Sequence, residues 1–98
     1  MHEVALAQGI LDVVLDVADG RQVQTVRVRA GELLAVSDDS LQFCFELVAQ
    51  DTLAATARLE VQITPGDALL IDGIELVEDG WQWRPDVVQD EAEHEVTT

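Results

Sequence analysis

The chain has 98 residues, enough for one domain with a single modest hydrophobic core. Twenty acidic residues stand against five arginines, with no lysine, so the formal net charge is −15. This charge argues against nucleic acids and anionic membrane surfaces as partners, because both would repel the chain. It leaves open a cationic ligand, a basic protein partner, or adaptation of the whole surface to a salty cytoplasm.

The sequence favours a cytoplasmic protein. No apolar run approaches the roughly 20 residues that a membrane-spanning helix needs, and no secretory leader precedes the first helical pattern. The only cysteine, Cys44, can form neither an internal disulfide nor a Cys-x-x-Cys zinc site. Its apolar neighbours at helical spacing indicate a small core residue.

Two segments have the apolar spacing that is typical of amphipathic helices. The first runs from Glu3 to Asp19, and its acidic side chains lie three or four residues apart on a face that we expect to be solvated. Gly20 follows as a C-cap residue. The second helix begins after Ser37, a favourable N-cap residue, and continues to about Gln50.

Alternating polar and apolar residues predict strands over residues 22–30 and 57–64. Gly31 is expected to break the first strand, and Pro65-Gly66 to end the second. The turn signals Asp72-Gly73 and Asp79-Gly80 then bracket a hairpin-like insert.

A last strand is predicted over residues 81–88, with Trp81 and Trp83 on one face and Pro85 placing it at an edge. The two tryptophans, like Phe43, either pack in the fold or, in the case of Trp83 with Arg84, form a patch that faces a partner. From residue 89 to 98 the acidic sequence has no periodicity, which predicts a disordered tail after a single domain over residues 1–88.

This order of elements favours an α+β fold. Two amphipathic helices would pack on one face of a small three-stranded, mostly antiparallel sheet, with a shortened hairpin-like insert. The other face of the sheet would then need cover, which a homodimer would supply. The residues expected to share the core are Val4, Leu11, Val14, Val26, Val28, Leu41, Phe45, Leu59, Val61 and Ile63.

Several motifs, taken as a set, resemble the nickel-incorporation metallochaperones of hydrogenase maturation, the HypA/HybF family. The resemblance covers nearly all of residues 1–64. It rests on Met1-His2-Glu3 directly before the first helix, Leu6-Ala7-Gln8, Ile10-Leu11, Gly31-Glu32-Leu33 with Val36, Leu41, Phe43 and Phe45, and TLAATARLEV over residues 52–61.

The chain departs from the family pattern after the second strand. Members of the family carry a zinc lobe there, with two Cys-x-x-Cys pairs, whereas this chain has only PGDALLIDG. The resemblance resumes at Ile74-Glu75-Leu76-Val77 and Gly80. The sequence is therefore similar to a variant that lacks the zinc lobe, and no zinc is expected.

The first three residues can bind a metal ion through fused chelate rings. The Met1 amine, the His2 amide nitrogen and the His2 imidazole can reach one ion, while Glu3 adds an amide nitrogen and an axial carboxylate. Met1 should be retained, because methionine aminopeptidases favour small second residues. Four nitrogens in a plane suit Ni(II) or Cu(II) better than zinc. Asp38 or Asp39 could fix the His2 ring by accepting its second hydrogen bond.

Simpler interpretations stay open for these residues. His2 could be an ordinary exposed terminal residue, and Glu3 a carboxylate that favours the start of a helix. His94, in EAEHE, could hold a metal loosely or belong to a solvated tail.

The resemblance implies a nickel metallochaperone that delivers Ni(II) to the large subunit of a nickel-iron hydrogenase, with a nickel-insertion GTPase as partner. No catalytic triad, phosphate loop or acid–base pair is evident, so we do not expect an enzyme. The alternative is a metal-free HypA-like interaction module, which binds the maturation partners as a scaffold or competitor.

Overall fold

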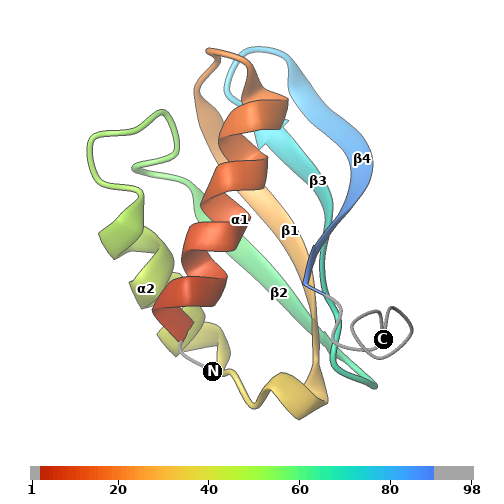
Figure 1. The fold of residues 1–98 in the computed structure, drawn as a ribbon. Helices are drawn as coiled ribbons and strands as arrows, with labels where there is room; N and C mark the ends of the chain where they lie inside the picture. Colours follow the sequence, from red (N-terminus) through yellow and green to blue (C-terminus); the bar gives the residue numbers. More distant parts are fainter. Residues whose placement is uncertain (1–2, 90–98) are drawn as a thin grey trace, which may run out of the picture.

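A computed structural model describes residues 3–89, which form two α-helices, a short 3-10 helix and one four-stranded sheet (Figure 1). The elements, in chain order, are α1 (Glu3–Ala18), β1 (Val23–Gly31), η1 (Glu32–Leu34), α2 (Asp38–Val48), β2 (Arg58–Thr64), β3 (Leu69–Leu76) and β4 (Gly80–Gln89). No helix among these residues is long and apolar enough to cross a bilayer.

The strand order is β2-β1-β3-β4, and both helices cover the same face of the sheet (Figure 1). β1 pairs with β2 in parallel, while the β1–β3 and β3–β4 pairs are antiparallel. The predicted α+β class is confirmed, including the mostly antiparallel pairing. The prediction of three strands is wrong, because the sheet has four.

The additional strand comes from the segment that was expected to form a hairpin-like insert. β3 runs straight through the Asp72-Gly73 turn signal, at a point where its pairing with β4 shifts register. The Asp72 carboxylate lies 2.7 Å from an Arg29 guanidinium nitrogen of β1, and Gly73 lies beside the Trp83 ring. The Asp-Gly pair therefore marks an irregularity within a strand here, although the same pair is also typical of tight turns.

Local sequence signals place the other element ends well. The Ser37 hydroxyl accepts a hydrogen bond from the Ser40 amide at 3.2 Å, so the predicted N-cap of α2 is confirmed. α1 ends at Ala18, and Gly20 then adopts a left-handed φ of 85°. Gln89, which was assigned to the acidic tail, is instead the last residue of β4.

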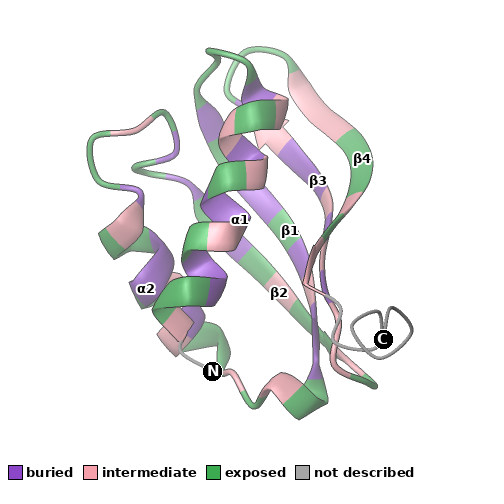
Figure 2. Ribbon diagram, in the orientation of Figure 1, coloured by how far each residue is buried: buried purple, intermediate pink, exposed green. Residues whose placement is uncertain are grey.

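The core lies between the helices and the sheet (Figure 2). Eight of the ten predicted core residues are buried or packed against it, and Cys44 is buried as expected. Val4 and Ile63 were predicted wrongly, since they are 49% and 51% exposed. Val4 occupies the first turn of α1 and Ile63 lies near the end of the edge strand β2, so both sit where the packing layer ends.

Gly31 does not break β1 but forms its last residue, opposite Thr64 of β2. Its φ of −64° is ordinary, so the requirement for glycine is one of space. A Cβ atom here would collide with the Gly66 carbonyl oxygen. Two hydrogen bonds hold these two backbone segments together at the crossing. The Gly31 amide donates to the Ala68 carbonyl at 2.8 Å, and the Leu33 amide donates to the Gly66 carbonyl at 2.9 Å.

Gly31→Ala should therefore destabilise the fold by about 1–3 kcal/mol, because two backbone segments must separate to admit the methyl group. Urea unfolding followed by circular dichroism measures the change in unfolding free energy. An unchanged free energy would mean that the crossing can widen without cost.

Candidate metal site and the adjoining groove

The described residues of the expected metal site, Glu3, Asp38 and Asp39, lie at the end of the molecule where both helices begin (Figure 1). Glu3 is the first residue of α1 and is half-buried. Met1 and His2, the other two expected ligands, lie outside the described residues, as does His94. The chain nevertheless fixes their connection, since they directly precede the first turn of α1.

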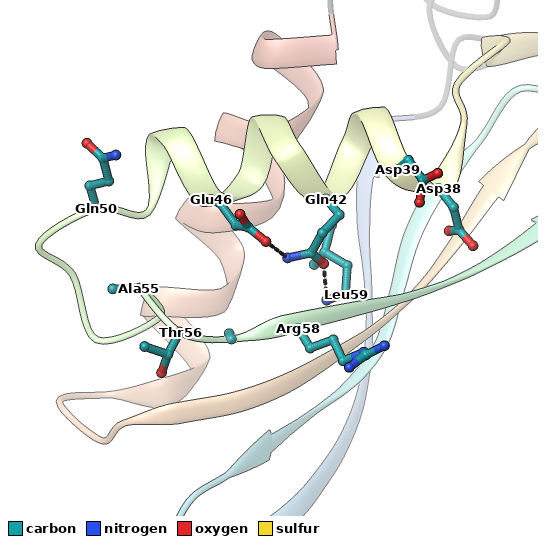
Figure 3. A pocket seen from close by; sticks show the side chains of 10 residues that line it. Asp38, Asp39, Gln42, Glu46, Gln50, Ala55, Thr56, Arg58 and Leu59 are labelled. Carbon is teal, nitrogen blue, oxygen red and sulfur yellow. Dashed lines mark hydrogen bonds between the residues drawn. The ribbon is translucent and has the colours of Figure 1, made fainter.

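Asp38 and Asp39 occupy the first turn of α2, where the helix dipole favours carboxylates. Both are exposed, and both line a groove of about 720 Å³ between α2 and the beginning of β2 (Figure 3). Glu46 of α2 adds a third carboxylate to the groove, while Arg58 is the one cation among the residues that line it. The groove therefore carries a negative balance of charge.

Gln42 fixes the distance between the two walls of this groove, a role that sequence analysis missed. Its side-chain oxygen accepts a hydrogen bond from the Leu59 amide at 2.8 Å, and its side-chain nitrogen donates to Glu46 at 2.6 Å (Figure 3). The four-residue spacing of Gln42 and Glu46 on a helix indicates their contact. The bond to Leu59 carries no sequence signal, because the two residues are 17 positions apart.

The described side chains do not make a metal site by themselves. Within residues 3–89, no three side chains of His, Cys, Asp or Glu come together as a bound ion would require. Glu3, Asp38 and Asp39 are thus not grouped around a common point. A site at this end would need ligands besides the side chains of the described residues.

The residues present do not fit a structural zinc ion. Such sites use four cysteine or histidine ligands, whereas this chain has one cysteine and two histidines in total. Cys44 is also buried in the core, on α2.

We expect the purified protein to contain no stoichiometric zinc and to keep its fold in excess strong chelator. Elemental analysis measures the zinc content, and circular dichroism with and without chelator measures the fold. One tightly held zinc ion per chain, or loss of the helical signal on chelation, would contradict this expectation.

The residues that hold Met1-His2-Glu3 and the elements from α1 to β2 match the sequence pattern of one family of metal carriers. The family described as hydrogenase/urease nickel incorporation metallochaperone, hypA, has a sequence model that matches residues 1–69. The chain belongs to the HypA family. Most of β3 and all of β4 lie beyond the matched residues.

Individual relatives are named hydrogenase maturation factor HypA. One from Archaeoglobus fulgidus is 41% identical over 83 residues, which cover 81% of this chain and 76% of the relative. One from Methanopyrus kandleri is 37% identical over 89 residues, covering 88% of this chain and 58% of the relative. One from Alkalilimnicola ehrlichii is 42% identical over 74 residues, covering 72% and 66%. The chain thus spans only about three fifths to three quarters of these proteins.

Proposed function

We propose that this chain binds one Ni(II) ion at its N-terminus and carries it to a nickel enzyme during maturation. The observation that carries the proposal is the position of Met1-His2-Glu3, at the start of α1 and within the residues that match the HypA family. An amine, an imidazole and two amide nitrogens supply the square-planar nitrogen set that Ni(II) accepts.

The chemistry of a carrier fits the rest of the chain. A terminal site can exchange its ion without opening the core, because its ligands lie before α1 or at the first residue of this helix. The excess of 15 negative charges raises the local concentration of cations around the protein. The carrier breaks no bond in a substrate, so this role is not that of an enzyme.

The acceptor and helper are further parts of the proposal. The relatives' names and the family description support hydrogenase maturation as the process that this chain serves. The resemblance in sequence adds the large subunit of a nickel-iron hydrogenase as the proposed acceptor and a nickel-insertion GTPase as the proposed helper. A cytoplasmic location belongs to the same proposal. Neither nucleic acid nor a membrane surface fits the charge of the chain.

An extended N-terminus tests nickel binding without changing any residue of the fold. Chain carrying Gly-Ser ahead of Met1 should lose high-affinity Ni(II) binding, because the amine then lies two residues away from the chelate rings. Titration calorimetry of the native and extended chains measures the difference, and circular dichroism of both controls for folding. Equal affinities would refute the terminal site, and absence of nickel binding by both chains would favour a metal-free interaction module.

A further inference from the structure

The two edge strands of the sheet are protected to different degrees. The strand order places β2 at one edge and β4 at the other. β4 contains Pro85 where its pairing with β3 shifts register, and near its end the Val88 side chain lies against Gly9 of α1. Proline, an irregular register and cover by a helix are devices that prevent further strands from pairing with an edge.

β2 lacks these devices over most of its length. It pairs with β1 along all of its residues without a register shift, whereas both other pairings in the sheet contain shifts. It contains neither proline nor lysine, and Ile63 near its end is 51% exposed. A regular, partly apolar edge of this kind is a template with which another strand can pair.

Gln42 marks the point at which the edge of β2 becomes open. The Leu59 amide donates to the Gln42 side chain at 2.8 Å, so it points away from β1 and toward α2 (Figure 3). Because successive residues of a strand direct their amides to opposite sides, Val61 and Ile63 also point away from β1. Among the described residues, no helix or loop group accepts a hydrogen bond from either amide. We call residues 61–63 the free edge.

The surface beside the free edge is acidic. The groove of about 720 Å³ between α2 and the beginning of β2 carries the carboxylates of Asp38, Asp39 and Glu46. A second hollow, of about 440 Å³, continues from it along β2 and is lined by Asp38 and Val61 among others. A strand on the free edge would therefore have the apolar Ile63 side chain at one end and carboxylates at the other.

We propose that the free edge binds an extended, basic segment of a partner protein as a fifth strand of the sheet. The main chain of this segment bonds to the backbone of Val61 and Ile63, which supplies affinity without regard to sequence. Its alternate side chains point to the helix side of the sheet, where an apolar residue contacts Ile63 and lysines or arginines enter the acidic groove.

The charge of the chain favours a basic partner over a second copy at this edge. The chain has no lysine, and three of its five arginines form ion pairs with carboxylates of the same chain. A second copy therefore offers few free cations to the groove, and its charge of −15 adds repulsion. A partner with a basic strand meets the opposite condition.

A synthetic peptide with capped ends, KTKTVTKTK, tests strand addition. It places valine and lysines on one side of a strand and reads alike in either direction, so the polarity of the added strand need not be known. Titration calorimetry on chain stripped of metal should show one-to-one binding below millimolar peptide, weakening as salt is added. Absence of binding, or binding unaffected by salt, would overturn the proposal, and neither result bears on nickel.

N-methylated peptides separate strand pairing from simple attraction of charge. One version is methylated on the threonines and the other on the remaining residues, so each loses the amides of one strand edge and keeps every positive charge. Only one edge of an added strand faces β2, so one version should bind at least about tenfold more weakly while the other keeps its affinity. Equal affinities of the two versions would refute strand addition.

Variants at Ile63 locate the binding edge. Ile63→Pro removes an amide that points away from β1, so the pairing of β1 with β2 survives and peptide affinity should fall about tenfold. Ile63→Val keeps the amide and should leave the affinity nearly unchanged. Circular dichroism of both variants controls for folding. Equal affinities of the two variants would place the peptide elsewhere.

A matched pair of charge variants covers the case in which Ile63→Pro disturbs the fold. Glu46→Gln removes one negative charge from the groove, and Glu78→Gln removes the same charge from the exposed turn between β3 and β4. Only Glu46→Gln should weaken peptide binding, by about threefold at low salt and less at high salt. Equal losses would mean that the net charge alone attracts the peptide, which would refute the groove as its site.

Discussion

Replacing His2 by alanine should abolish high-affinity nickel binding while leaving the fold intact. The imidazole closes one of the fused chelate rings, and the ligands that remain are an amine, amides and a carboxylate. None of the described side chains can substitute, because residues 3–89 contain no cluster of three metal-binding groups. Titration calorimetry on untagged chain should show one Ni(II) site in the native protein and none of comparable affinity in the variant.

Two controls separate the ligands of this site. Acetylating the Met1 amine should have the same effect as His2→Ala, since it removes the other end of the chelate. Glu3→Gln should weaken binding much less, because the backbone nitrogen survives and only an axial oxygen is lost. If the native protein and His2→Ala bind nickel alike, the terminus is not the site.

Nickel affinity should also fall steeply as the pH is lowered through the range where amines and imidazoles take up protons. Binding must displace protons from the amine, the imidazole and the amides, so lowering the pH increases the competition of protons with nickel for these groups. A site made of carboxylates, such as the groove beside α2, would weaken only at more acidic pH. The pH profile therefore distinguishes the terminal site from loose binding to the acidic surface.

Phe45→Ala should lower the unfolding free energy by about 3–5 kcal/mol, a large share of the 5–15 kcal/mol that holds a typical domain folded. Phe45 is among the largest fully buried side chains of the core, on the face of α2 that packs inward. Removing its ring leaves a cavity that the surrounding helices and strands can fill only in part.

Phe43 gives a matched control two residues earlier on the same helix. Its side chain is 61% exposed, so Phe43→Ala should change the unfolding free energy by no more than about 0.5 kcal/mol. Urea unfolding at one fixed protein concentration, followed by circular dichroism, gives both values. Similar losses for the two variants would mean that α2 does not present Phe45 to the core as described.

Local sequence determined much of this protein. Apolar spacing set the two helices, Ser37 set the beginning of α2, and alternation set β1 and β2. These features depend on residues within a few positions of one another, so the sequence shows their causes directly. The family resemblance, read from motifs over residues 1–64, is also confirmed by a match over residues 1–69.

The expected metal site also has one part that the sequence alone suggests and one part that needs the folded chain. Its Met-His-Glu ligands are contiguous, so the sequence alone suggests them, and their binding of nickel stays a prediction. The relation of Asp38 and Asp39 to Gln42 and Arg58 is different, because a groove needs both α2 and β2. The hydrogen bond from Leu59 to Gln42 joins those elements across 17 residues.

Tertiary structure alone decided the parts in which distant segments compete with local signals. The Asp72-Gly73 pair predicts a turn, yet Arg29 holds the aspartate and Trp83 covers the glycine within a continuous β3. Gly31 resembles a strand breaker, yet it is needed because Gly66 crosses beside it. Local sequence specifies which conformations a segment prefers. These two glycines are required for a different reason, because a distant segment of the chain leaves no room for a side chain, and that contact exists only once the sheet has formed.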